Sequence, residues 1–140
     1  MRSYTPIALQ IIVGLGIGAA LPVSAFAQAE TGVQARLTPA YRECHTRSGG
    51  GFPEAVCLGE ESLRQDARLN AQWRRTLSGM SALEGRSLRR HQRGWIARRD
   101  AHCKAEVVAD DVLGATAKLV YNDCYLDLTV RRIMFLERLR

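Results

Sequence analysis

Apolar residues recur at helical spacing along most of the chain, and no segment alternates between apolar and polar residues over a useful length. The pattern predicts a short helix that begins at Thr38-Pro39, where threonine suits the N-cap and proline the first helical position. Three long helices are expected over about residues 53–79, 86–108 and 115–138. We therefore predict an all-α fold, a small disulfide-stapled antiparallel bundle of three long helices plus one short N-terminal helix.

Each long helix has one face that we expect to be buried. On the first long helix this face holds Leu63, Asp66, Asn70, Trp73, Leu77 and Met80. On the second it holds Leu88, Gln92, Trp95, Arg99 and Cys103. On the third it holds Tyr121, Cys124, Leu128, Phe135 and Leu139. Polar groups are therefore expected inside the bundle.

The first 27 residues have the pattern of a secretory signal peptide. Arg2 precedes an apolar run over residues 7–21, and Ala25-Phe26-Ala27 supplies small residues for a cleavage site. An uncleaved membrane anchor is the alternative, because this stretch is about long enough to span a bilayer. We expect cleavage after residue 27, a flexible tail over residues 28–37, and a helical domain over residues 38–140 in the periplasm or outside the cell.

The four cysteines are expected to form disulfides in an exported protein, and three pairings are possible. Cys44 and Cys57 flank a glycine-rich bend, and Cys103 and Cys124 flank the break near residues 110–114. Two antiparallel helices bring such positions to the same level. We therefore predict the pairs Cys44–Cys57 and Cys103–Cys124.

A metal site is the alternative use of these cysteines, because His45 adjoins Cys44 and His102 adjoins Cys103. The spacings match no zinc-ligand pattern, and adjacent residues on a helix point in different directions. We predict no metal and no other cofactor.

Four polar residues lie on the faces that also carry the two tryptophans: Asp66, Asn70, Gln92 and Arg99. A buried charge without a partner costs several kcal/mol, so these side chains should contact one another. We predict an ion pair between Asp66 and Arg99, with the two amides completing a hydrogen-bonded layer. The layer is expected to be structural, because no second carboxylate, histidine base or Ser/Cys nucleophile stands at a recognisable spacing. The chain is therefore not expected to be an enzyme.

The same residues form a longer pattern: Asp66-x-x-Leu69-Asn70, Gln92-x-x-Trp95-x-x-x-Arg99-Asp100-x-x-Cys103, and Cys124 followed by Leu128-Thr129 and Arg132. This pattern resembles the LprI-type lysozyme-inhibitor family, a bacterial exported domain, over about residues 38–139. The resemblance implies a four-helix domain with two intramolecular disulfides in the cell envelope. Two positions differ from the common family pattern, namely residues 112–115, where many members have Gly-Gly-Ser, and Trp73, where tyrosine is commoner. Only some members are credited with lysozyme inhibition, and no inhibitory residues can be carried over.

Composition and charge narrow the possible functions. The hydrophobic content of 46% excludes a disordered chain, and the single long apolar run excludes a polytopic membrane protein. The formal net charge is +6, and the face of residues 86–108 opposite the buried one carries Arg86, Arg90 and Arg93. Such a basic face is usually only a solvated surface.

Two functional hypotheses remain for an exported binding protein. One is an inhibitor of lysozyme, in which an arginine engages the two carboxylates of the glycosidase; against it, animal lysozymes are cationic and would repel a basic partner at long range. The alternative is an envelope module whose basic face binds anionic cell-wall polymer, lipid headgroups or an acidic partner protein. Nucleic acid is a poor candidate for an exported chain with few aromatic residues. No stable membrane insertion is expected after cleavage, and residues 49–51 and 81–85 are the expected exposed tips.

Overall fold

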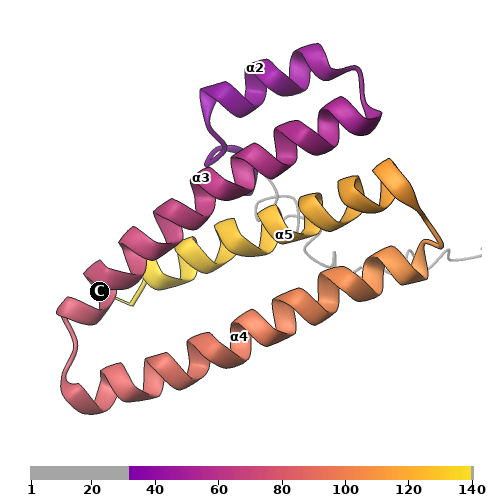
Figure 1. Cartoon of the computed structure of the whole chain (residues 1–140). Coiled ribbons are helices and arrows are strands. Elements are labelled where there is room, and N and C mark those ends of the chain that lie inside the picture. Colours follow the sequence, from indigo (N-terminus) through magenta and orange to yellow (C-terminus); the bar gives the residue numbers. More distant parts are fainter. Residues whose placement is uncertain (1–31, 140) are drawn as a thin grey trace, which may run out of the picture.

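The structure, a computed structural model, describes residues 32–139 and consists of helices joined by short loops (Figure 1). The helices are α2 (Pro39–Ser48), α3 (Gly51–Ser78), α4 (Ala82–Ala109) and α5 (Gly114–Glu137). The described part of the chain contains no strand, so the all-α prediction is confirmed. None of the helices within residues 32–139 is both long enough and apolar enough to cross a membrane. The predicted signal peptide lies outside the described residues.

The helix ends follow local sequence signals. The Thr38 hydroxyl accepts a hydrogen bond from the Tyr41 backbone amide, so Thr38 is the N-cap of α2 as predicted. Gly49 ends this helix with φ 64°, a left-handed conformation that glycine adopts without a side-chain clash. Helix α4 begins at a capping box formed by Ser81 and Glu84.

Helix α5 is the central element of the fold. Figure 1 shows α5 lying between α3 and α4, and it packs closely along both, most extensively along α3. It is therefore buried on more than one side, through Leu126, Thr129, Val130, Arg132, Ile133 and Leu136. The single face predicted for α5 is right for Cys124, which is buried, and only partly right for the half-buried Tyr121, Leu128 and Phe135. It is wrong for Leu139, which is exposed beyond the helix end.

The buried face of α3 lies one residue earlier than predicted. It runs through Leu58, Ser62, Gln65, Leu69, Gln72 and Thr76. Leu63 and Asn70, which were expected to be buried, are exposed, while Asp66, Trp73, Leu77 and Met80 are half-buried. The prediction failed because several of the buried positions are polar, so the apolar pattern favoured the neighbouring face. The face predicted for α4 is confirmed at Leu88, Arg99 and Cys103, which are buried, and Gln92 and Trp95 are half-buried.

The segment before α2 belongs to the core. Val33 and Leu37 are buried in one apolar cluster with Tyr41 and Leu58, and Arg36 forms an ion pair with Glu137 at 2.9 Å. The flexible tail predicted over residues 28–37 is therefore wrong from residue 33 onward. The side chains of Val33 and Leu37, four residues apart, pack into the apolar cluster that α2 and α3 help to form. Residues 28–31 lie outside the described chain.

Both predicted disulfides are confirmed. Cys44–Cys57 joins α2 to α3, and Cys103–Cys124 joins α4 to α5, with Cα atoms 5.7 and 5.6 Å apart. Each disulfide joins two helices that are connected by a short loop, at residues 49–50 or 110–113, and both of these loops lie on the right in Figure 1. We call this side the disulfide end, and the opposite side, with the turn at residues 79–81 and the first half of α4, the arginine end.

Candidate functional site

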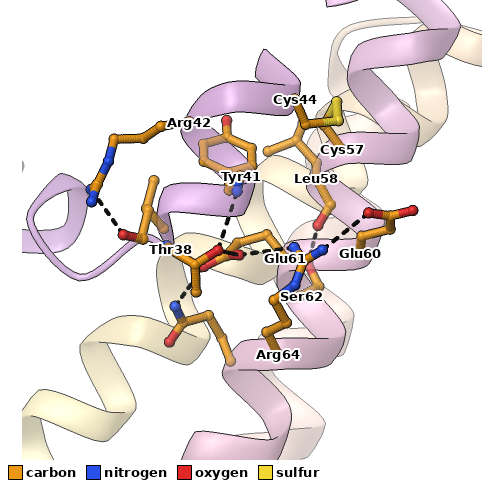
Figure 2. Close-up of polar contacts among 12 residues, drawn as sticks. Thr38, Tyr41, Arg42, Cys44, Cys57, Leu58, Glu60, Glu61, Ser62 and Arg64 are labelled. Atoms are coloured by element: carbon orange, nitrogen blue, oxygen red, sulfur yellow. Dashed lines mark hydrogen bonds and ion pairs between the residues drawn. A yellow bond between two sulfur atoms is a disulfide. The ribbon is translucent and has the colours of Figure 1, made fainter. Parts of the chain in front are cut away.

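A buried carboxylate anchors the start of α2 on α3. Glu61 is fully buried and accepts hydrogen bonds from the backbone amide and hydroxyl of Thr38, as Figure 2 shows. Gln65 donates to the same carboxylate at 2.7 Å and Arg64 at 3.2 Å. Burial alone would raise the pKa of Glu61, but these hydrogen bonds outweigh it and the pKa lies below its ordinary value. The charged form of Glu61 therefore stabilises the α2–α3 pair.

A second buried carboxylate lies at the other end of α2. Glu54 accepts hydrogen bonds from the hydroxyls of Ser48 and Tyr41, and its Oε1 lies 2.8 Å from Nδ1 of His45. Burial raises the pKa of Glu54, but the contacts with Ser48, His45 and Tyr41 outweigh it, so the net shift is downward. Glu54 and Glu61 together hold both ends of α2, and the sequence analysis identified neither.

The predicted ion pair between Asp66 and Arg99 is wrong. Tyr125 of α5 lies between the two residues: its hydroxyl donates to Asp66 at 2.8 Å, and the Arg99 guanidinium lies 3.9 Å from the centre of its ring. The ion-pair partner of Arg99 is the adjacent Asp100, at 2.8 Å. Helices α3 and α4 do not meet at this level because α5 separates them, so an aromatic ring of α5 links the two charges.

Two arginine side chains lie close to the Trp95 ring. The Arg99 guanidinium is 5.0 Å from its ring centre and that of Arg132, on α5, is 5.3 Å away. Arg132 also donates to the Gln92 side-chain oxygen at 2.7 Å and lies 4.5 Å from the ring centre of Phe135. Gln92 is half-buried, and its partner is Arg132, not Asp66, Asn70 or Arg99 of the predicted layer. Such cation–π contacts contribute about 0.5–2 kcal/mol each, the larger values in desolvated sites.

Arg132 is a buried cation without a carboxylate. It is only 4% exposed, and no acid within residues 32–139 pairs with it. Burial lowers the pKa of Arg132, and repulsion from Arg98 lowers it further. The Arg132 guanidinium also lies 3.2 Å from Nδ1 of His91. The aromatic rings and the Gln92 side-chain oxygen thus take the place of a counter-ion.

Asn70 does not join this layer. It faces a groove of about 230 Å³ between α3 and α4, which is also lined by Trp73, Arg89, Gln92, Arg93 and Ile96. The three residues of the predicted basic face, Arg86, Arg90 and Arg93, are all exposed. The arginines that form ion pairs in the described chain are others: Arg36, Arg47, Arg64, Arg99 and Arg131.

One group of side chains within residues 32–139 has metal-ligand geometry, namely His102, Glu106 and Cys124. The sulfur of Cys124 is committed to its disulfide with Cys103, so it offers no thiolate. His102 and Glu106 instead form an exposed ion pair at 3.1 Å. His45, the other histidine considered for a metal, contacts Glu54.

The fold and its interior define a small helical domain, cross-linked by two disulfides and tied together by polar and cation–π contacts. The chain belongs to the LprI family: the family model described as "Lysozyme inhibitor LprI" matches residues 51–136, which span α3, α4 and nearly all of α5. Comparisons with curated proteins and with solved structures gave no match. The motif residues Asp66, Gln92, Trp95, Arg99 and Arg132 all take part in the contacts that join the helices.

Proposed function

We propose that the protein is an exported, non-enzymatic inhibitor of lysozyme that acts by protein–protein contact. The observation that carries this proposal is the family match over residues 51–136. Most of the motif residues are buried or half-buried and contact a neighbouring helix, whereas Asn70 is exposed. Recognition of a partner therefore has to come from surface residues that this frame positions, and a cross-linked frame lowers the entropy lost on binding.

Export is part of the proposal. We propose that residues 1–27 are removed as a signal peptide and that the rest folds in the periplasm or outside the cell as one antiparallel bundle. Two disulfides and the absence of a free cysteine in the described chain support an oxidising compartment. The domain begins no later than Val33, because that residue is in the core.

The direct test is a clearing assay. Purified, oxidised protein should slow the clearing of a peptidoglycan suspension by lysozyme when the two proteins are present in equal amounts, and a panel of lysozymes defines its range. A matched sample with both disulfides reduced and alkylated should lose this effect. Unchanged clearing by every lysozyme at a large molar excess of oxidised protein would refute the proposal.

The exposed arginines of α4 support a second candidate, an envelope module that binds anionic polymer. Arg86, Arg90 and Arg93 are exposed and form no ion pair with another described residue. In this case the protein should co-sediment with peptidoglycan or with phosphatidylglycerol vesicles in a salt-dependent manner. Reversing the charge at all three positions should abolish sedimentation; sedimentation that survives the reversal contradicts a role for this face.

A further inference from the structure

Large apolar side chains project from the loop that joins α4 to α5. Val108 is 78% exposed and Leu113 is 87% exposed, the two most exposed large hydrophobic residues of the described chain. They flank a tight turn in which the Asp111 amide donates to the Val108 carbonyl at 3.2 Å. Solvated apolar groups at a loop tip cost free energy in the isolated protein, and such exposure is typical of contact surfaces.

A second apolar edge lies at the same end of the molecule. Phe52 and Val56, in the first turns of α3, are exposed. The Lys118 ammonium of α5 lies 5.9 Å from the ring centre of Phe52, and the Asn122 side chain donates to the Ala55 carbonyl at 3.0 Å. These contacts tie the start of α3 to the first half of α5, and the disulfide end thus exposes apolar side chains of α3 as well as those next to the α4–α5 loop.

The loop between α4 and α5 has a defined shape before any partner binds. The Cys103–Cys124 disulfide cross-links α4 and α5, the two helices that this loop connects. Asp111 and Gly114 adopt left-handed conformations, with φ 49° and 62°, and the hydrogen bond from the Asp111 amide to the Val108 carbonyl closes the turn. A loop held in this way loses little conformational entropy on binding.

The charge of this loop is opposite to that of the protein as a whole. Residues 105–117 include Glu106, Asp110 and Asp111 and no lysine, arginine or histidine, whereas residues 85–99 contain six arginines and no acid. Burial raises the pKa of Asp123 on α5, and repulsion from Asp127 and Glu106 raises it further. An apolar tip with an acidic rim fits a cationic protein surface that has an apolar hollow.

We infer that the disulfide end, with Val108 and Leu113 at its tip and Asp110 and Asp111 at its rim, is the surface that docks on lysozyme. This inference rests on the proposed function. It also removes the electrostatic objection to that function, because a cationic lysozyme is repelled by the arginine end and attracted to the acidic loop. The charge distribution thus orients the encounter.

The first test compares two exposed leucines in the full oxidised protein, Leu113→Ser at the disulfide end and Leu83→Ser, which is 69% exposed, at the arginine end. Leu113 is the N-cap of α5, a position that serine favours, so this substitution should preserve the fold. Leu113→Ser should weaken lysozyme binding and inhibition at least about tenfold, while Leu83→Ser should leave both within about twofold. Equal affinities for both variants, or a larger loss with Leu83→Ser, would overturn the inference.

The second test concerns the rim. Asp110→Asn/Asp111→Asn should slow association with lysozyme at low salt, and Arg86→Gln/Arg90→Gln, which also removes two charges, should leave association unchanged or faster. The opposite order would overturn the inference.

Binding of lysozyme, measured by calorimetry, separates this inference from the proposed function. Inhibition that survives both disulfide-end variants keeps the proposed function and rejects this surface. Binding without inhibition that is lost in Leu113→Ser keeps the surface and rejects inhibition. The absence of both binding and inhibition in the wild type rejects both.

Discussion

The two ends of the molecule differ in cross-linking and in charge. The disulfide end has both cross-links, two buried carboxylates that fix α2, and an acidic, apolar loop. The arginine end has no cross-link, and its charge comes from exposed guanidinium groups. Residue 90 of α4 and residue 110, its C-cap, are separated by about 30 Å at 1.5 Å per residue, well beyond the screening length of about 8 Å at physiological ionic strength. The two ends therefore act on partners independently.

Among the changes considered, removal of a disulfide should have the largest effect on the stability of the disulfide end relative to the arginine end. The pair Cys103→Ser/Cys124→Ser removes a cross-link between residues 21 apart and should lower the free energy of unfolding by about 3 kcal/mol. Denaturant unfolding measures the loss, and hydrogen exchange locates it. Exchange should increase around residues 105–120 more than around residues 82–95. A uniform increase along α4 would show that the disulfide does not stabilise its own end selectively.

Glu61 and Glu60 offer a matched pair, because both contact Arg64 and only Glu61 is buried. Glu61→Gln weakens several charge-assisted hydrogen bonds and should cost about 2 kcal/mol. Glu60→Gln should cost less than about 1 kcal/mol, the usual value for an exposed pair. Thermal unfolding of both variants checks the difference, and similar costs would contradict the anchoring role of Glu61.

Lowering the pH should destabilise the disulfide end before the arginine end. The pKa values of Glu54 and Glu61 are lowered in the folded protein, so their charged forms add stability above the ordinary carboxyl pKa of about 4.3. This contribution is lost as the pH falls through the lowered pKa values. The melting temperature should therefore fall between pH 5 and 3 in the wild type and fall less in Glu54→Gln/Glu61→Gln. Parallel curves for the two proteins would contradict the assignment.

Tyr125 connects the helices midway between the two ends. Tyr125→Phe removes the hydrogen bond to Asp66 and should cost about 1 kcal/mol. Tyr121→Phe is the control, since the Tyr121 hydroxyl has no hydrogen-bond partner in the described chain and should contribute little. Denaturant unfolding distinguishes the two variants, and an equal loss would show that the hydrogen bond from Tyr125 to Asp66 adds no stability of its own.

The smallest effect on stability is expected at the arginine end. Arg90→Gln alters a solvated side chain and should change the free energy of unfolding by less than about 0.5 kcal/mol. Thermal unfolding measures this change. A larger loss would show that the basic face supports the fold.

The sequence predicts the helices, both disulfides and the buried face of α4, because these depend on local spacing and on hairpin geometry. The phase of α3 was mispredicted because Gln65, Gln72 and Thr76 are buried, and polar residues carry no periodic apolar signal. The partner of Arg99 was mispredicted for a different reason. Which side chain lies between α3 and α4 depends on the position of α5, and periodicity within each helix does not specify that position.

The two guanidinium groups close to Trp95, those of Arg99 and Arg132, make this residue a fluorescence reporter inside the protein. The emission of an indole depends on the charges and the water around it, and here one of the cations belongs to the same helix and the other to α5. With Trp73 changed to phenylalanine, Trp95 is the remaining tryptophan of residues 32–139. The fluorescence of Trp95 then reports, in real time and without a label, whether α4 and α5 remain packed against each other when a partner protein binds.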